Sequence, residues 1–291
     1  MSKILLFNAT GAQGGTIAAR LIEKGYEVLA PARSLEKVEK LLERNIKGFS
    51  TDFSEESLRS IIERVDQIIL QIPAAVAPQT MITIAQNAMK AILSAGYPKT
   101  VFVISSTITG QKIGVPSVDA RVEMVNLAKT YLPDTPILSA TEYLENFSTA
   151  YREPILQNNI IPQTIPPDFP VNYLSWADLA TYVIAVLESD QLEGKIYPIG
   201  GKEGLNGRSL AERLGTIIGR KLKYVPISHK DLEGILTPIL GPDVAKDYAA
   251  FYQWQDTAGA DLLNPDTSSI RHLLNIELPD FEVWARAAFK N

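Results

Sequence analysis

The feature that most constrains the fold is an alternation of short apolar runs with longer helical patterns over the first 140 residues. Each short run is rich in β-branched or other apolar residues and is too short for a helix, which predicts a strand. Strands that alternate with helices predict a parallel sheet covered by helices on both faces. The predicted strands are Ile4 to Asn8, Glu27 to Ala32, Gly48 to Thr51, Gln67 to Gln71, Thr100 to Ile104 and Pro136 to Ser139.

The helices between these strands have recognisable ends. The helical pattern from Gln13 to Lys24 stops before Gly25, because glycine tolerates the left-handed backbone that follows a helix. Ser34 precedes the pattern from Leu35 to Arg44 and is a good N-cap. We expect the next helix to begin near Ser54.

The alternation breaks after residue 150, where a stretch rich in proline predicts irregular structure. Proline disrupts the interior of helices and of central strands, so this stretch predicts a domain boundary. We expect an α/β domain over residues 1–150 and a smaller, mixed and mostly helical lobe over residues 151–291. Part of this lobe, about residues 171–200, could belong to the main sheet instead. It has a helical pattern from Trp176 to Glu188 and then a strand pattern from Lys195 to Ile199, and that strand could add to the sheet. The prolines are Pro154, Pro162, Pro166, Pro167 and Pro170.

The remainder of the lobe is expected to be mostly helical. Ser209 and Glu212 have the spacing of a capping box, which places the start of a helix at Ser209. That helix should end at Gly219, and the tail from Leu232 onward has a mostly helical pattern.

The turn after the first strand, from Asn8 to Gly15, predicts a dinucleotide site. Asn8, Gly11 and Gly14 are spaced three residues apart, and Gly15 follows where the helix begins. Free amides and the dipole at a helix N-terminus bind anions, and glycines let the backbone approach a pyrophosphate. Asparagine tolerates the left-handed backbone that a first glycine would supply. The predicted contacts are Asn8, Thr10, Gly11, Ala12, Gln13, Gly14 and Gly15; the alternative is an ordinary tight turn.

The residues after the second and third strands indicate which nucleotide binds. About 20 residues after the turn, an NAD site normally offers an acidic residue to the ribose hydroxyls. This chain offers Arg33, which suits the 2′-phosphate of NADP(H), and Lys37 lies one helical turn later. NADP(H) is therefore favoured over NAD(H), unless both cations are simply solvated. Asp52 could accept a hydrogen bond from the adenine, with Phe53 beside the ring, or it could cap a helix.

Composition argues against several other classes of protein. The net charge is −5 and the basic residues are scattered, so no nucleic acid partner is expected. No apolar run approaches the roughly 20 residues of a membrane span, and no secretory signal precedes the first strand, so we expect a cytoplasmic protein. With no cysteine, and with His229 and His272 far apart, no metal site is expected.

The motifs of common enzyme classes are missing. Short-chain dehydrogenases commonly use a tyrosine with a lysine four residues later, and none of the 11 tyrosines has that lysine. A Walker A sequence, an HExxH pair and a Gly-x-Ser-x-Gly elbow are absent as well. ATPase, zinc protease and α/β-hydrolase activities therefore lose their usual basis.

Several stretches, in this order, resemble the NmrA-like family of atypical short-chain dehydrogenases/reductases. They begin with the glycine turn, Ala32-Arg33 and Glu145-Asn146-Phe147. The resemblance continues through Leu174 to Leu179, Gly194 to Gly201 and Leu278 to Ala285, and so covers most of the chain.

The resemblance implies a doubly wound Rossmann domain with a smaller C-terminal substrate lobe. It also implies that the glycine turn and Arg33 hold NADP(H). Members of the family include quinone and azo-compound reductases, isoflavone-type reductases, and redox sensors that bind the nucleotide without turning it over. Many carry a lysine before a Val-Glu pair, where this chain has Asp119, which puts lysine-dependent chemistry in doubt.

Further site residues are expected at strand ends, because ligands bind at the C-terminal ends of the strands in open α/β sheets. Tyr143 is the candidate catalytic contact to the acceptor, with a tyrosine packed between lobes as the alternative. The dense aromatic group Tyr248, Phe251, Tyr252 and Trp254 either lines a pocket for a planar substrate or packs into the core. The predicted nucleotide contacts at strand ends are Gln71, Ile72, Pro73, Ser105, Thr141 and Glu142.

The leading hypothesis is an NADPH-dependent oxidoreductase that transfers a hydride to a quinone-like or other conjugated small molecule. A hydroquinone anion takes its proton from water, so no strong general acid is needed. The alternative is a non-catalytic NADP(H)-binding redox sensor that acts through a protein partner, which the missing dyad favours. A sugar-nucleotide epimerase needs an acid/base residue near the nicotinamide and is least favoured. The sequence leaves a homodimer open.

Overall fold

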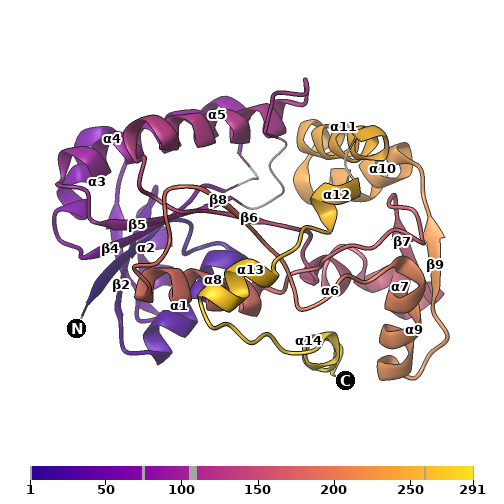
Figure 1. Cartoon of the computed structure of the whole chain (residues 1–291). Helices are drawn as coiled ribbons and strands as arrows, with labels where there is room; N and C mark the ends of the chain where they lie inside the picture. Colours follow the sequence, from indigo (N-terminus) through magenta and orange to yellow (C-terminus); the bar gives the residue numbers. More distant parts are fainter. Residues whose placement is uncertain (1, 74–75, 105–109, 259, 291) are drawn as a thin grey trace. The chain divides into compact units, whose positions relative to one another are not determined.

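The computed structural model describes residues 2–73, 76–104, 110–258 and 260–290. Its main element is a seven-stranded sheet in which every pair of neighbours is parallel (Figure 1). This confirms the predicted α/β class. In spatial order the strands are β3 (Lys47–Ser50), β2 (Glu27–Ala32), β1 (Lys3–Leu6), β4 (Gln67–Gln71), β5 (Lys99–Ile104), β6 (Ile137–Ala140) and β8 (Ile196–Ile199).

The strand order reverses at β1, which pairs with β2 on one side and with β4 on the other. The sheet is therefore doubly wound, and the C-terminal ends of β1, β2 and β4 meet where such sheets bind ligands. Ile4, Leu5 and Leu6 are completely buried, as expected of a central parallel strand with helices on both faces.

Helices cover the two faces of the sheet. One face packs against α3 (Glu55–Ile62), α4 (Pro78–Ser94) and α5 (Pro116–Tyr131), and Leu5, Met89 and Phe102 belong to the resulting core. The other face is covered by α1 (Ala12–Glu23), α2 (Leu35–Leu42) and α8 (Trp176–Glu188) (Figure 1). Ile4 and Leu6 point to this second face because side chains alternate along a strand.

The chain divides into two compact units. The first comprises residues 1–140, 179–199 and 268–276, and thus includes most of α8, all of β8, and α13 (Ser268–Leu273). The second comprises residues 141–178, 200–267 and 277–291. The predicted strand near Lys195 is β8, which extends the main sheet beside β6.

The second unit is mostly helical and has its own apolar core, which includes Phe147, Leu210 and Phe281. A two-stranded parallel sheet pairs β7 (Ile160–Gln163) with β9 (Lys223–Pro226). Its helices are α6 (Glu145–Ser148), α7 (Arg152–Asn158), α9 (Gly207–Ile218), α10 (His229–Leu240), α11 (Pro242–Ala258), α12 (Ala260–Leu263) and α14 (Phe281–Ala288).

Two of the prolines that predicted irregular structure lie in regular elements, so that part of the prediction was wrong. Pro154 is the third residue of α7, where the first turn of a helix needs no amide donor. Pro162 lies in β7, which has a single neighbouring strand and so does not need every amide to donate.

The helix caps agree with the predictions at three places and correct a fourth. Ser34 and Ser54 are the N-caps of α2 and α3, and each side chain accepts a hydrogen bond from a backbone amide in the first turn. The predicted start at Ser209 was wrong, because Asn206 caps α9 and accepts the Ser209 amide at 2.9 Å. The predicted end at Gly219 is confirmed by its left-handed φ of 68°.

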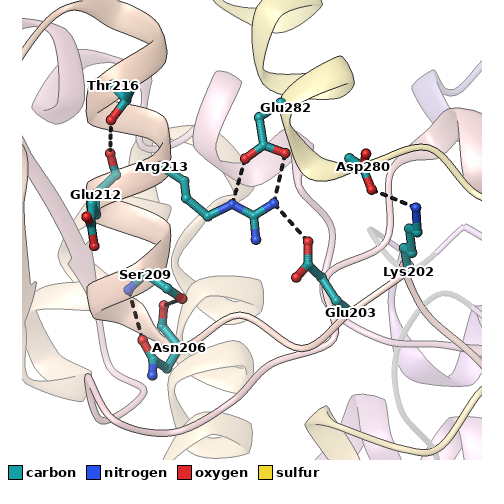
Figure 2. A network of polar contacts seen from close by, with 9 residues as sticks. All are labelled: Lys202, Glu203, Asn206, Ser209, Glu212, Arg213, Thr216, Asp280 and Glu282. Carbon is teal, nitrogen blue, oxygen red and sulfur yellow. Dashed lines mark hydrogen bonds and ion pairs between the residues drawn. The ribbon is translucent and has the colours of Figure 1, made fainter.

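Ion pairs hold the C-terminal helix to the second unit (Figure 2). Arg213 on α9 donates to both carboxylate oxygens of Glu282, at 2.7 and 2.8 Å, and also pairs with Glu203 at 2.8 Å. Lys202 pairs with Asp280, the residue before α14, at 2.7 Å. The chain's last helix is therefore fixed by its charges as well as by its apolar face.

Candidate functional site

The turn between β1 and α1 is built on Asn8, whose φ of 62° lies in the left-handed region. Its carbonyl accepts the amide of Gly11 at 2.9 Å, which closes the turn. Asparagine is among the few residues with a side chain that adopt this conformation readily. Asn8 thus adopts the left-handed backbone conformation that the sequence predicted for it.

The three glycines of the turn are needed for different steric reasons. A Cβ on Gly14 would lie 2.2 Å from the carbonyl oxygen of Asn8, and one on Gly11 would lie 2.7 Å from the Asn8 side-chain oxygen. A Cβ on Gly15 would instead lie 2.5 Å from the guanidinium of Arg44. Arg44 also donates to the carbonyl of Ala9 at 3.2 Å, and this hydrogen bond stabilises the turn. The sequence carried no signal for Arg44, because this contact joins residues far apart in the chain.

The N-terminus of α1 is open to an anion. Gly11 is its N-cap and supplies no capping side chain, and the first turn holds no acidic residue. The first amides of a helix carry a partial positive charge and have no partner within the helix. The Gln13 side chain accepts a hydrogen bond at 2.8 Å from the completely buried Gln71, at the end of β4. This hydrogen bond ties the start of α1 to the end of β4.

A hollow of about 110 Å³ opens at the C-terminal ends of β1, β2 and β4. It lies entirely within the first unit, at the strand-order reversal that positions ligands in this fold. Many of the predicted nucleotide contacts line it, namely Asn8, Thr10, Arg33, Lys37, Phe53, Gln71, Ile72 and Pro73.

Positive charge gathers at one end of this hollow. The guanidinium carbon of Arg33 lies 5.5 Å from the centre of the Phe53 ring, a cation–π contact that orients the side chain. Neither Arg33 nor Lys37 forms an ion pair with any described residue, and the nearby Glu36 pairs with Lys40 instead. Both cations are exposed, so their charge is available to a ligand.

Asp52 has a structural partner set of its own. Its Oδ1 accepts the Ser54 amide at 2.9 Å and the Ser57 hydroxyl at 2.7 Å. These hydrogen bonds lower the pKa of Asp52 to about 2. Asp52 is not among the residues that line the hollow, and the helix N-cap is Ser54. An adenine contact by Asp52 therefore stays a prediction.

The remaining predicted contacts lie elsewhere. Ser105 is outside the described residues, and Thr141, Glu142 and Tyr143 belong to the second unit. The Thr141 hydroxyl donates to the carbonyl of Asn172, and the backbone of Tyr143 bridges to Leu174. These bonds fix the segment after β6, and the role of Tyr143 stays a prediction.

Asp119, at the position where relatives were expected to carry a lysine, closes the loop before α5. Its carboxylate accepts the amides of Ile113, at 2.7 Å, and Gly114, at 3.2 Å. An acceptor is therefore built into this position, where a lysine would supply only donors.

The Glu145-Asn146-Phe147 motif organises the second unit. One oxygen of Glu145 accepts the Trp176 amide and the Trp284 indole N–H, both at 3.1 Å. Burial raises the pKa of Glu145 to about 7. The two hydrogen bonds lower this pKa, but their effect is smaller than that of burial. Phe147 is completely buried, with its ring centre 5.2 Å from that of Tyr173. The motif thus links α6, the start of α8 and α14.

The aromatic group on α11 is partly a core stripe. Phe251 and Tyr252 are buried, with ring centres 5.7 Å apart, and Phe251 stacks on Trp254 at 6.3 Å.

Across the described ranges, no group of three or more acidic or histidine side chains is placed to hold a metal ion. Within the same ranges, no helix is long and apolar enough to cross a membrane.

Comparison with known proteins places these observations in a family. A model of the NmrA-like family matches residues 1–284. The chain is 25% identical over 262 residues to the photosystem II assembly factor Ycf39 of Synechocystis, covering 87% of this chain and 76% of that protein.

Two solved structures share the fold over nearly the full length. The triphenylmethane reductase of Citrobacter has a TM-score of 0.81 at 18% identity, covering 99% of this chain and all 100% of that one. The NADPH-dependent quinone oxidoreductase QOR2 of Escherichia coli, in complex with NADPH, has a TM-score of 0.79 at 20% identity, with coverage of 99% and 100%.

Proposed function

The chain belongs to the NmrA-like family, and from this premise we propose that it is an NADPH-dependent reductase that transfers a hydride to a quinone-like or other conjugated small molecule. Two proteins with the same fold support this proposal, a triphenylmethane reductase and a quinone oxidoreductase. Their sequences are 18% and 20% identical to this chain, so the likeness concerns the fold alone. The activity itself is therefore argued from the residues of this chain.

The observation that carries the proposal is the pair of cations at the hollow beside the glycine turn. Arg33 rests on Phe53 and is joined by Lys37, and neither is neutralised by an ion pair with a described acid. Guanidinium groups bind phosphates with charge-assisted, often bidentate hydrogen bonds. A 2′-phosphate on an adenosine ribose would supply the missing negative charge, which favours NADP(H) over NAD(H).

The turn itself fits a pyrophosphate. Gly14 leaves the space that a Cβ would fill, and the uncapped amides of α1 would donate to the phosphate oxygens. When bound, NADPH would supply the hydride for the acceptor. Gln71, Ile72 and Pro73 at the end of β4 would hold the nucleotide along the sheet edge, and Tyr143 is proposed to contact the acceptor.

The proposed reaction needs little acid–base catalysis by the protein. Hydride addition to a quinone leaves a hydroquinone anion, which takes its proton from water. The protein therefore has to bind both partners, align them and exclude bulk water. This is consistent with a chain that lacks the Tyr-x-x-x-Lys pair and has Asp119 committed to backbone amides.

The test is to mix the protein with NADPH and a panel of quinones and to follow NADPH absorbance. We expect oxidation clearly above the rate without protein, and faster with NADPH than with NADH. Tight NADPH binding with no turnover across the panel would contradict the reductase proposal. It would favour the alternative of a redox sensor, which predicts different affinities for NADP⁺ and NADPH.

A further inference from the structure

The backbone at Phe53, in the loop between β3 and α3, is held in an uncommon conformation. Its φ of 62° lies in the left-handed region, which glycine and asparagine adopt readily and an aromatic residue rarely does. Phe53 also lines the hollow beside the glycine turn. A strained backbone of this kind persists only where neighbouring groups hold it, so the contacts of Phe53 indicate what the conformation serves.

Two side chains hold the peptide groups on either side of Phe53. Its amide donates to Oγ1 of Thr51, in the same loop, at 3.0 Å. Its carbonyl accepts a hydrogen bond at 2.9 Å from the side-chain nitrogen of Asn87, which lies in α4. A carbonyl oxygen can only accept, so this bond requires the donor group of the asparagine amide. Asn87 therefore ties the loop to a helix that packs against the sheet.

The ring that these bonds place has two neighbours in the first unit. Phe7, the residue before Asn8, is 1% exposed, and its ring centre lies 6.5 Å from that of Phe53. The guanidinium carbon of Arg33 lies 5.5 Å from the Phe53 ring centre, close enough for a cation–π attraction. A change of backbone at Phe53 would turn the ring away from Arg33. The left-handed conformation therefore serves to keep the ring beside the cation.

Asn87 stands one step behind the residues that line the hollow. It is half-buried and is not itself a lining residue, whereas Ile84, three positions earlier on the same face of α4, is one. Asparagine is a poor residue for the interior of a helix, where leucine is favoured. The hydrogen bond to Phe53 is the contact that an asparagine makes here and a leucine could not.

We propose that Asn87 is a positioning residue for nucleotide selection. By holding the carbonyl of Phe53 it keeps the ring beside Arg33, and the ring keeps the guanidinium at the end of the hollow where the 2′-phosphate would bind. This inference rests on the proposed function, which supplies NADP(H) as the ligand. Loss of the Asn87 donor lets the loop relax, so Arg33 stays charged but loses its support. The preference for NADPH over NADH then falls, although no residue that touches the nucleotide has been changed.

The experiment compares the dissociation constants of NADPH and NADH, by fluorescence titration, for wild type, Asn87→Leu, Phe53→Leu and the double variant. Asn87→Leu removes the donor at similar size, and Phe53→Leu keeps an apolar side chain without an aromatic face. We expect each single change to lower the preference for NADPH by about 2- to 10-fold, the size of one cation–π contact. Because Asn87 acts through the ring, the double variant should lose no more preference than Phe53→Leu alone.

A matched control and a second variant separate this role from a general effect on folding. Gln86→Leu changes the neighbouring residue of α4, which is also half-buried and makes no side-chain hydrogen bond to a described residue, and should leave both dissociation constants unchanged. Asn87→Asp keeps the shape of the side chain but lacks the donor, so it should lose the preference as Asn87→Leu does. Thermal unfolding shows which variants are folded at the temperature of the titration.

Failure of this inference and failure of the proposed function give different results. Wild-type preference in the folded Asn87 variants would overturn the inference and leave the NADP site intact. Equal weakening of NADPH and NADH, or additive losses in the double variant, would overturn it as well. A wild type without preference for NADPH would contradict the NADP site itself, and the inference with it. Tight, selective NADPH binding without quinone turnover would contradict only the reductase, because the inference is measured by binding.

Discussion

At the residue scale, Asn8 and Gly14 make the glycine turn together. Asn8 takes the left-handed conformation, and its carbonyl then occupies the space beside Gly14. Gly15 has a different neighbour, the end of the flexible Arg44 side chain. The two adjacent glycines should therefore respond differently to substitution.

We expect Gly14→Ala to damage nucleotide binding far more than Gly15→Ala. A Cβ added at position 14 would lie 2.2 Å from a backbone oxygen, so the turn must open, whereas a Cβ added at position 15 would displace a side chain that can move. NADPH titration by fluorescence, with thermal unfolding of both variants, measures the effect. Wild-type affinity in Gly14→Ala would show that the turn is not the nucleotide site.

Several residues that line the hollow could be predicted to lie together, because their positions relative to the strands are set locally. Asn8, Arg33 and Phe53 stand at fixed positions relative to strands, and a parallel sheet brings those strand ends together. Arg44 could not be predicted, since it reaches the turn through a tertiary contact. Asp52 was assigned two alternative roles, and its hydrogen bonds to Ser54 and Ser57 are a third that the sequence did not indicate.

At the scale of elements, the strands were predictable because parallel strands are buried on both faces and read as continuous apolar runs. The helix start at Ser209 was wrong because Asn206, three residues earlier, competes for the same cap and accepts the Ser209 amide. The irregular structure predicted at Pro154 and Pro162 was wrong for a related reason. A proline interrupts a helix or a strand where its missing amide would have donated a hydrogen bond, and neither position requires that donor.

Glu145 joins three helices, and its ionisation should make the stability of the second unit depend on pH. Its pKa is about 7 in the fold, against 4.5 as the ordinary value. The folded state therefore keeps a proton that the unfolded state loses, and stability falls as pH rises from the ordinary value to the folded one. Asp178, whose pKa burial also raises and whose charge acts on Glu145, contributes in the same direction.

We expect Glu145→Gln to flatten this dependence, because glutamine keeps an oxygen for Trp176 and Trp284 without the charge. The free energy of unfolding in urea, measured between pH 5 and pH 8, tests this expectation. The substitution should remove a pH-dependent change in that free energy on the order of 1–3 kcal/mol. Glu153→Gln, on the exposed side of α7, is the control. An unchanged pH slope in Glu145→Gln would assign the dependence to other groups.

At the scale of the whole molecule, the two units divide the proposed work. The first unit carries the doubly wound sheet, the glycine turn and the hollow with Arg33. The second unit carries Tyr143, and its C-terminal helix is fixed by Arg213. The sequence predicted a change of structure after residue 150 and allowed residues 171–200 to return to the main sheet, where β8 pairs with β6.

The central claim is that Arg33 makes this an NADP site, and the most direct test is the dissociation constant of NADPH and of NADH for wild type and Arg33→Asp. We predict that wild type prefers NADPH and that Arg33→Asp weakens NADPH by about 10- to 100-fold, with NADH little changed, because a charge-assisted contact to the 2′-phosphate is lost. Arg64→Asp is the matched control, since Arg64 also lies over a ring, that of Phe49, at 5.9 Å, but does not line the hollow. Equal weakening of NADPH and NADH by Arg33→Asp, or no preference in the wild type, would contradict the claim.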